Sequence, residues 1–253
     1  MNKKVKRRDQ RQRICDGWVV SSIFPLRVCH PSAPPHYEVL DCSNVTSERE
    51  LRSIFQRDFP TNYFSKFLMD GNMYVSTLSE GTFGEKSFRE VVITNGVLGR
   101  VEPKALLGSV LSLQEIDLES NYLTYFPAEE IPLYTNLESL NLRGNKLTSL
   151  ANILSQTLMD VKLDGNPMGH VPVDFLQDVP ELQIFSCSSC GLTEIQTGTF
   201  TRGPQLRFVD LGYNELTFLP EGAFNLAPFD SMLVLSDNKL SSASQEPLTV
   251  RLL

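Results

Sequence analysis

The most constraining feature of this chain is a residue spacing that recurs eight times. In each copy a marker residue, usually Asn, follows apolar residues eight, five and three positions earlier, and another apolar residue comes two positions later. The clearest copy consists of Leu137, Leu140, Leu142, Asn145 and Leu147. Successive markers lie 24, 25, 24, 21, 24, 24 and 24 residues apart, and they are Asn72, Gly96, Asn121, Asn145, Asn166, Cys190, Asn214 and Asn238. A period held over this length predicts a stack of similar coils, each of which packs on its neighbours.

This spacing is the leucine-rich-repeat signature. Each copy predicts a short strand with alternate residues pointing into the core, a turn at the marker and a return segment that closes the coil. We therefore predict an α/β fold: a leucine-rich-repeat solenoid of about eight repeats with a curved parallel sheet, over residues 63–253. The marker amides are expected to bind backbone groups of adjacent coils. Gly96 has no side-chain donor, so we expect local looseness at the second repeat.

The residues before the repeats predict two further segments, a basic and disordered head over 1–27 and an amino-terminal cap over 28–62. Within the cap, the alternation from Tyr37 to Cys42 favours a strand. Thr46-Ser47-x-x-Glu50 is a capping box that opens a helix through about Arg57. Because an open solenoid end exposes its core, a strand and an amphipathic helix form a suitable lid.

Charge and hydropathy exclude several classes of function. The net charge is −7, and the first 13 residues carry +6, with seven Lys or Arg against Asp9, so the remainder carries −13. An acidic repeat array disfavours nucleic-acid binding, which needs a basic footprint. No apolar run approaches the roughly 20 residues of a membrane-spanning helix. We find no nucleophile-base pair, phosphate loop or metal cluster, and predict a non-enzymatic protein without a cofactor.

The five cysteines fall into two groups. Cys29 and Cys42 enclose a proline-rich loop beside the cap strand, where a disulfide is expected in a secreted protein, and Cys15 is then left over. Cys187 and Cys190 instead occupy a core position and a marker position of the sixth repeat. We expect this pair to be buried structural thiols, because a disulfide there requires the strand to distort, and no metal site is expected.

Localisation depends on weaker signals. Asn44-Val45-Thr46 is an acceptor for N-glycosylation in a secreted chain. A convincing secretion signal is absent from the basic head and the apolar stretch that follows it. The alternatives are an extracellular recognition module and an intracellular or nuclear scaffold, the second favoured by the Lys- and Arg-rich head.

Two sets of residues resemble known families. The segments Gly198-Thr-Phe200 and Gly222-Ala-Phe224 resemble extracellular leucine-rich repeats of animals. Asp41-Cys42-Ser43, Ile54-Phe55-Gln56, Asp58-Phe59-Pro60 and Gly96-Val97-Leu98 are similar to the family that contains the non-catalytic subunit of the secreted shrimp (Oplophorus) luciferase. That resemblance implies a secreted, non-enzymatic chain that accompanies other proteins, a catalytic subunit among them. One cap cysteine of the family is missing here, because Arg27-Val28-Cys29 stands where Cys-x-Cys is expected. The family's Cys-rich carboxyl cap is missing as well, so both ends are expected to be incomplete.

The repeat register also predicts which residues face the concave surface, where partners bind. Strand residues six, four and two positions before each marker are free of the core. One strand presents three carboxylates there, Glu115, Asp117 and Glu119, and consecutive later strands present Ile184, Phe208 and Met232. We interpret the first set as a dock for a basic partner or a solvated acidic face. The second set is an apolar anchor or a surface covered by the chain's own tail, residues 241–253.

Overall fold

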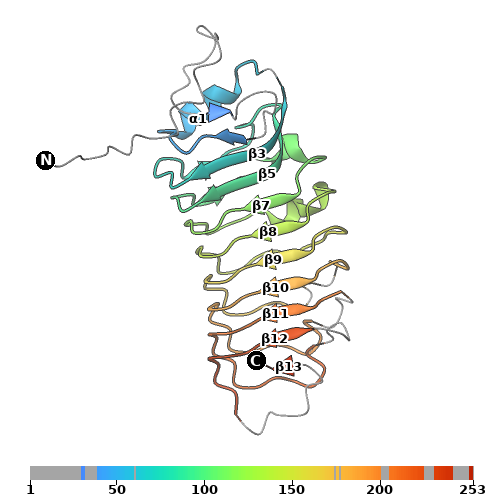
Figure 1. Cartoon of the computed structure of the whole chain (residues 1–253). Helices are drawn as coiled ribbons and strands as arrows, with labels where there is room; N and C mark the ends of the chain where they lie inside the picture. Colours follow the sequence, from blue (N-terminus) through green and yellow to red (C-terminus); the bar gives the residue numbers. More distant parts are fainter. Residues whose placement is uncertain are drawn as a thin grey trace, which may run out of the picture.

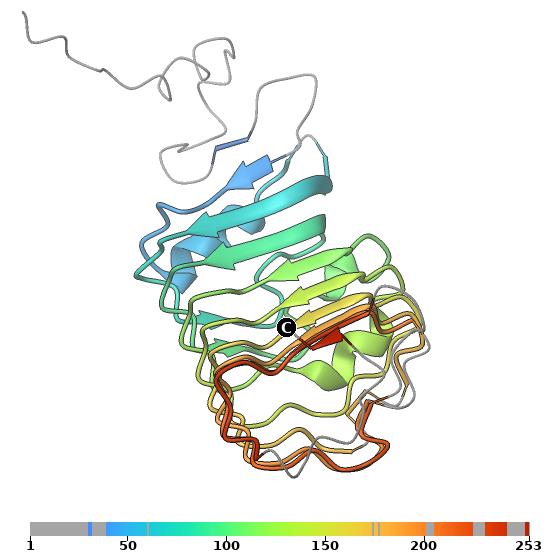
Figure 2. The same cartoon turned by 60° about the horizontal axis from the view of Figure 1, so that its bottom comes forward.

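A computed structural model of the chain describes residues 30–31, 39–59, 61–173, 175–176, 178–200, 205–224, 231–241 and 251–252. It is an elongated stack of coils in which one strand per coil adds to a single long sheet (Figure 1). When the stack is turned so that its carboxyl-terminal end comes forward, the later coils overlap, with their strands on one side and their return segments on the other (Figure 2). The predicted leucine-rich-repeat solenoid is therefore confirmed.

Among the described residues, the sheet has eleven strands, and only β1 and β2 pair antiparallel. In sheet order the strands are β1 (His30–Pro31), β2 (Val39–Asp41), β3 (Tyr63–Asp70), β5 (Ser87–Thr94), β7 (Glu115–Asp117), β8 (Ser139–Asn141), β9 (Asp160–Lys162), β10 (Ile184–Ser186), β11 (Phe208–Asp210), β12 (Met232–Val234) and β13 (Arg251–Leu252). Most are three residues long, but backbone bonds continue past them, as in Leu142 N–H to the Lys162 carbonyl at 2.8 Å.

Strand pairing follows the register of the markers. Glu115 pairs with Ser139, and Ser139 pairs with Asp160. The second pairing keeps the register although the markers of its two coils, Asn145 and Asn166, are only 21 residues apart. The shorter repeat therefore loses residues from its return segment and keeps its strand. In strands β7 to β12 the central residue is buried in the core, and its two neighbours are partly exposed except for Ser186 of β10, which is also buried. These central residues are Ile116, Leu140, Val161, Phe185, Val209 and Leu233.

Helix α1 (Glu48–Phe55) lies at the amino-terminal end of the stack (Figure 1) and begins at the predicted capping box, although it ends two residues before the predicted Arg57. Ser47 is its N-cap, and its hydroxyl accepts a bond of 3.1 Å from the Glu50 N–H. The Glu50 carboxylate accepts in return from the Thr46 N–H at 2.8 Å. Phe55 is buried against rings from four different segments, at centroid distances between 5.0 and 6.1 Å; these rings are Phe59, Phe67, Phe83 and Phe88.

The return segments contain little regular structure. The described part holds a short two-stranded parallel sheet, β4 (Thr77–Leu78) with β6 (Arg100–Val101), and two 3₁₀ helices, η2 (Leu107–Ser109) and η3 (Ala128–Leu133). Further along, the rings of Phe185, Phe200 and Phe224 follow one another at 5.3 and 5.2 Å between centroids. Aromatic side chains therefore fill both the cap end and the later coils.

The marker asparagines form the ladder of amides that the sequence predicted. The Asn145 amide nitrogen donates to the Leu118 carbonyl of the preceding coil and to the Leu142 carbonyl of its own, both at 2.9 Å. Its carbonyl oxygen accepts from the Leu123 N–H at 2.9 Å. The amide nitrogens of three further markers also donate to one carbonyl of the preceding coil and to one carbonyl of their own coil; these markers are Asn166, Asn214 and Asn238. Adjacent coils are thus joined inside the core as well as through the sheet.

The residue before each marker has a left-handed backbone, a feature that we did not predict. Its φ angle lies between 51° and 69° in all eight copies, at Gly71, Asn95, Ser120, Gly144, Gly165, Ser189, Tyr213 and Asp237. This conformation turns the chain sharply inward, so that the marker side chain enters the core. The three glycines and the Asn among these residues, which tolerate positive φ better than other residues, were the signal in the sequence.

Gly96 does not leave the loose coil that we expected, and that prediction is wrong. A Cβ atom on Gly96 would lie 2.7 Å from the Asn72 carbonyl oxygen and 3.1 Å from the Asn121 side-chain oxygen. The Asn72 carbonyl approaches this closely because it accepts a bond of 3.2 Å from the Val97 N–H. A glycine at this marker therefore permits close packing of the first two coils.

Candidate functional site

The residues that the sequence assigned to the concave surface form aligned columns on one side of the sheet. We call this side, turned away from the core, the outer sheet face. One column runs across strands β3 to β12 and consists of Lys66, Glu90, Glu115, Ser139, Asp160, Ile184, Phe208 and Met232. A second column, two residues later in each strand, contains Asp117, Asn141, Lys162, Ser186 and Asp210. The register brings each predicted set together.

Glu115 and Asp117 lie half-buried on β7 at the middle of this face. Burial is the largest cause that raises the pKa of Glu115, and the negative charge of Glu90, its partner on β5, raises it further. Burial likewise raises the pKa of Asp117, although the Glu119 N–H donates to its carboxylate at 3.0 Å. No ion pair involves either carboxylate among the described residues.

Three further carboxylates of the outer sheet face form ion pairs within the fold, namely Glu90, Asp160 and Asp164. Glu90 lies 2.8 Å from Lys66 and 2.7 Å from Arg89. Burial acts to raise the pKa of Glu90, but these two cations outweigh it and lower the value. Asp160 is paired with Lys162, and Asp164 with Arg143, while the Ser186 hydroxyl also donates to Asp164 at 2.7 Å.

Glu119, the third carboxylate of the predicted acidic set, is also satisfied within the fold. The Asn141 amide on the next strand donates to its carboxylate at 3.0 Å. None of the three carboxylates forms an ion pair among the described residues. The set divides in another way, because Glu119 accepts the Asn141 amide while burial raises the pKa of Glu115 and of Asp117. The sequence placed all three on one strand face but carried no signal for this difference, which depends on side chains about one repeat away.

The raised pKa values predict a pH dependence of stability. Glu115 and Asp117 have higher pKa values in the folded chain than their ordinary values of 4.5 and 3.8. At a pH between the ordinary and the raised pKa, the folded state therefore binds more protons than the unfolded state. Their protonation favours folding below the ordinary values, and this contribution is lost as the pH rises through the raised values. We expect the double variant Glu115→Gln, Asp117→Asn to gain thermal stability relative to the native chain progressively as the pH rises above these ordinary values.

The exposed carboxylates Glu194 and Glu221 lie outside the strands, so a Glu194→Gln, Glu221→Gln variant is the matched control. Its stability difference from the native chain should stay nearly constant over the same pH range. Thermal unfolding midpoints of the three proteins measure both effects. A constant difference for the Glu115 and Asp117 variant would contradict the assigned pKa shifts.

Ile184, Phe208 and Met232 form the predicted apolar row. Ile184 pairs with Phe208, and Phe208 with Met232, so the three side chains occupy the same position on consecutive strands. Each is partly buried and reaches the outer sheet face. Tail residues 251–252 form β13, in which Arg251 pairs with Met232, so this part of the tail extends the sheet beyond the row. Residues 242–250 lie outside the described residues.

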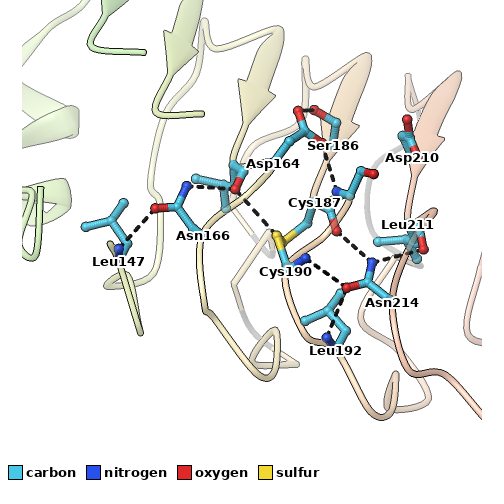
Figure 3. The surroundings of a disulfide bond; sticks show 12 residues. Leu147, Asp164, Asn166, Ser186, Cys187, Cys190, Leu192, Asp210, Leu211 and Asn214 are labelled. Atoms are coloured by element: carbon cyan, nitrogen blue, oxygen red, sulfur yellow. Dashed lines mark hydrogen bonds between the residues drawn. A yellow bond between two sulfur atoms is a disulfide. The ribbon is translucent and has the colours of Figure 1, made fainter. Parts of the chain in front are cut away.

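Cys187 and Cys190 form a disulfide bond, which corrects the prediction of a free thiol pair (Figure 3). We expected a disulfide to require a distorted strand. The left-handed Ser189, with φ of 54°, turns the chain between the two cysteines and brings their Cα atoms to 5.5 Å, within the range for a disulfide. The Cys190 sulfur lies 3.4 Å from the Leu163 carbonyl oxygen, where other coils place an amide donor. A bonded sulfur carries no proton, so a covalent link replaces that donor.

The remaining predicted residues lie at or near the cap. Cys42 is buried and disulfide-bonded, but Cys29 and Cys15 lie outside the described residues, as does the basic head. The Cys29–Cys42 pairing stays a prediction. Asn44 is exposed in the turn between β2 and α1, accessible to modification. In the described ranges, no helix is long and apolar enough to span a bilayer, and no three His, Cys, Asp or Glu side chains form a metal-binding group.

Together, the coil, the amide ladder and the parallel sheet define the class: the chain is a leucine-rich-repeat solenoid. Residues 136–156 match the family model Leucine Rich Repeat. Among solved structures, TLR13 in its ssRNA13 complex superposes with a TM-score of 0.68 over 80% of this chain and 28% of that one, at 19% identity. That likeness concerns the fold alone.

In sequence, the chain is similar to the Oplophorus-luciferin 2-monooxygenase non-catalytic subunit of Oplophorus gracilirostris. The two are 39% identical over 207 residues, which cover 80% of this chain and 58% of that subunit. This confirms the resemblance inferred from the cap residues. Lumican of Gallus gallus is 27% identical over 61% of this chain and 45% of its own length. Tsukushi of Gallus gallus is 30% identical over 39% of this chain and 27% of its own length. The chain thus spans little more than half of the first relative.

Proposed function

We propose that this chain is a non-enzymatic recognition or accessory subunit that binds a protein partner on its outer sheet face. The observation that carries the proposal is the apolar row of Ile184, Phe208 and Met232, aligned on a face whose middle strands, β7 to β9, present polar side chains. The similarity to a subunit named as non-catalytic supports an accessory role. A catalytic subunit is one candidate partner, because that relative's name places it within an enzyme.

Phe208 is the central residue of the row and provides the test. Burial of one large apolar side chain by a partner contributes about 1.5–3 kcal/mol, which corresponds to roughly a ten- to hundredfold change in affinity. We expect Phe208→Asp to leave the fold intact and to reduce partner capture by at least that factor. Quantitative co-purification from the native source, compared between variants, measures the loss.

Phe218 offers a matched control, since it is 57% exposed and lies outside the strands. Phe218→Asp introduces the same charge and should leave capture unchanged. If the Phe208→Asp variant captures the partner as well as the native chain does, the proposed site is contradicted. Circular dichroism of both variants separates loss of binding from loss of fold.

We also propose that the chain acts outside the cell. Its disulfides support this location, because such bonds persist in oxidising compartments. Mass spectrometry of native protein should find the Cys187–Cys190 bridge, a bridge from Cys29 to Cys42, and a glycan on Asn44. The alternative, an intracellular or nuclear scaffold directed by the basic head, predicts reduced cysteines and an unmodified Asn44.

A further inference from the structure

The outer sheet face is divided into three zones along the stack. Strand β7 presents Glu115 and Asp117, two half-buried carboxylates that form no ion pair among the described residues. Strands β8 and β9 and the residues just after them present polar groups whose charges are paired within the fold, Arg143 with Asp164 and Lys162 with Asp160. Strands β10 to β12 present the apolar row. A ligand that matched only the carboxylates would leave the apolar row uncovered, and a ligand that matched only the apolar row would leave the carboxylates unpaired.

The charges of the carboxylate zone, Glu115 and Asp117, are electrostatically unfavourable for the fold. Glu115 directly faces Glu90 on the neighbouring strand, and like charges opposite one another in a sheet are destabilising. The nearest cations are engaged elsewhere, Lys66 with Glu90 and Lys162 with Asp160. A cationic side chain from outside the fold would supply the compensation that Glu115 and Asp117 lack.

Strand spacing gives the distance between the two zones. Neighbouring strands lie about 4.8 Å apart, so the apolar row begins about 14 Å from β7 at β10 and ends about 24 Å away at β12. An extended segment, which advances about 3.3 Å per residue, covers this distance with about four to seven residues. A helix, at 1.5 Å per residue, needs about 10 to 16.

We propose that one segment of a protein partner lies across the strands of the outer sheet face and is recognised at two points. At one end a Lys or Arg side chain binds Glu115 and Asp117, and at the other a cluster of apolar side chains covers Ile184, Phe208 and Met232. The partner is thus basic and apolar, with the two features separated by about four to seven extended residues or by three to four helical turns. This inference rests on the proposed function and adds the chemistry and spacing of the partner.

A displayed library of random 16-residue peptides tests the proposal without knowledge of the natural partner. The whole chain is used as bait in three forms: native, the Glu115→Gln, Asp117→Asn variant, and Phe208→Ser. Selection on the native chain is expected to enrich Lys or Arg at one end and Leu, Ile, Phe or Met at the other, with the derived separation. The carboxylate variant should lose the basic preference alone, and Phe208→Ser the apolar preference alone.

The best native peptide is then synthesised and its affinity measured against all three forms. We expect about a tenfold weaker affinity for each variant, and a salt dependence that disappears in the carboxylate variant. The Glu194→Gln, Glu221→Gln control should bind as the native chain does. The proposal is overturned if no peptides are enriched or if the enriched peptides lack basic residues. It is also overturned if the basic preference survives the loss of both carboxylates. Apolar enrichment that only Phe208→Ser removes would overturn it while leaving the proposed function in place.

Discussion

Asn145→Ala is expected to lower the free energy of unfolding by about 2–4 kcal/mol. The Asn145 side chain is fully buried, and its amide joins two coils. Its removal leaves the Leu123 N–H without its acceptor, and each buried polar group that loses a partner costs about 1–3 kcal/mol. The Leu118 and Leu142 carbonyls also lose a donor, but each still accepts from a second marker amide, at Asn121 and Asn166.

Urea unfolding followed by circular dichroism measures this loss. Asn152→Ala is the matched control, because Asn152 is exposed in the same repeat, and its effect should stay within about 0.5 kcal/mol. Hydrogen exchange locates the damage, which should be greatest at the amides of the third and fourth coils since repeats contact mainly their neighbours. Equal stability of the two variants would show that the amide ladder contributes little.

Gly96→Asn is expected to destabilise the chain even though it completes the repeat pattern. The marker register alone predicts that an Asn here adds amide bonds and strengthens the stack. In the structure, the new Cβ would lie 2.7 Å from the Asn72 carbonyl oxygen, so the backbone of one coil must move. Overpacking of this kind typically costs about 1–3 kcal/mol.

Gly81→Asn is the control for this substitution. Gly81 has a φ of 71°, which Asn tolerates better than most residues, and no atom lies within 4 Å of the position its Cβ would take. Its effect on the free energy of unfolding should be small. A stabilised Gly96→Asn chain would show that the coils separate easily, and the close packing assigned to Gly96 would then be wrong.

The fold was predictable because its information is local and periodic. Apolar residues at fixed offsets from each marker determine which side of a strand enters the core, so the outer columns could be named before any coordinate was known. The capping box at Ser47 and Glu50 is likewise local, since both partners lie within one helical turn. Even the shortened interval before Asn166 left the pairing of Ser139 with Asp160 unchanged.

The state of individual site residues was not predictable in the same way. Glu119 and Glu115 occupy similar positions in the pattern, but only Glu119 receives the amide of Asn141. The disulfide between Cys187 and Cys190 likewise depended on the turn at Ser189, a backbone conformation that residue spacing does not report. In both cases the deciding factor is a side-chain orientation or a φ angle.

The sequence by itself therefore determined the solenoid, its register and the residues of the outer sheet face, because burial of a periodic apolar pattern admits one arrangement of coils. Only the tertiary structure decided which charges are paired, which cysteines are bonded and why Gly96 is a glycine. These properties depend on spatial distances of a few ångströms between atoms. The residues concerned are separated in the sequence by as few as three positions or by as much as a full repeat. Periodicity places such atoms in neighbouring coils, but the geometry of contact sets their interaction.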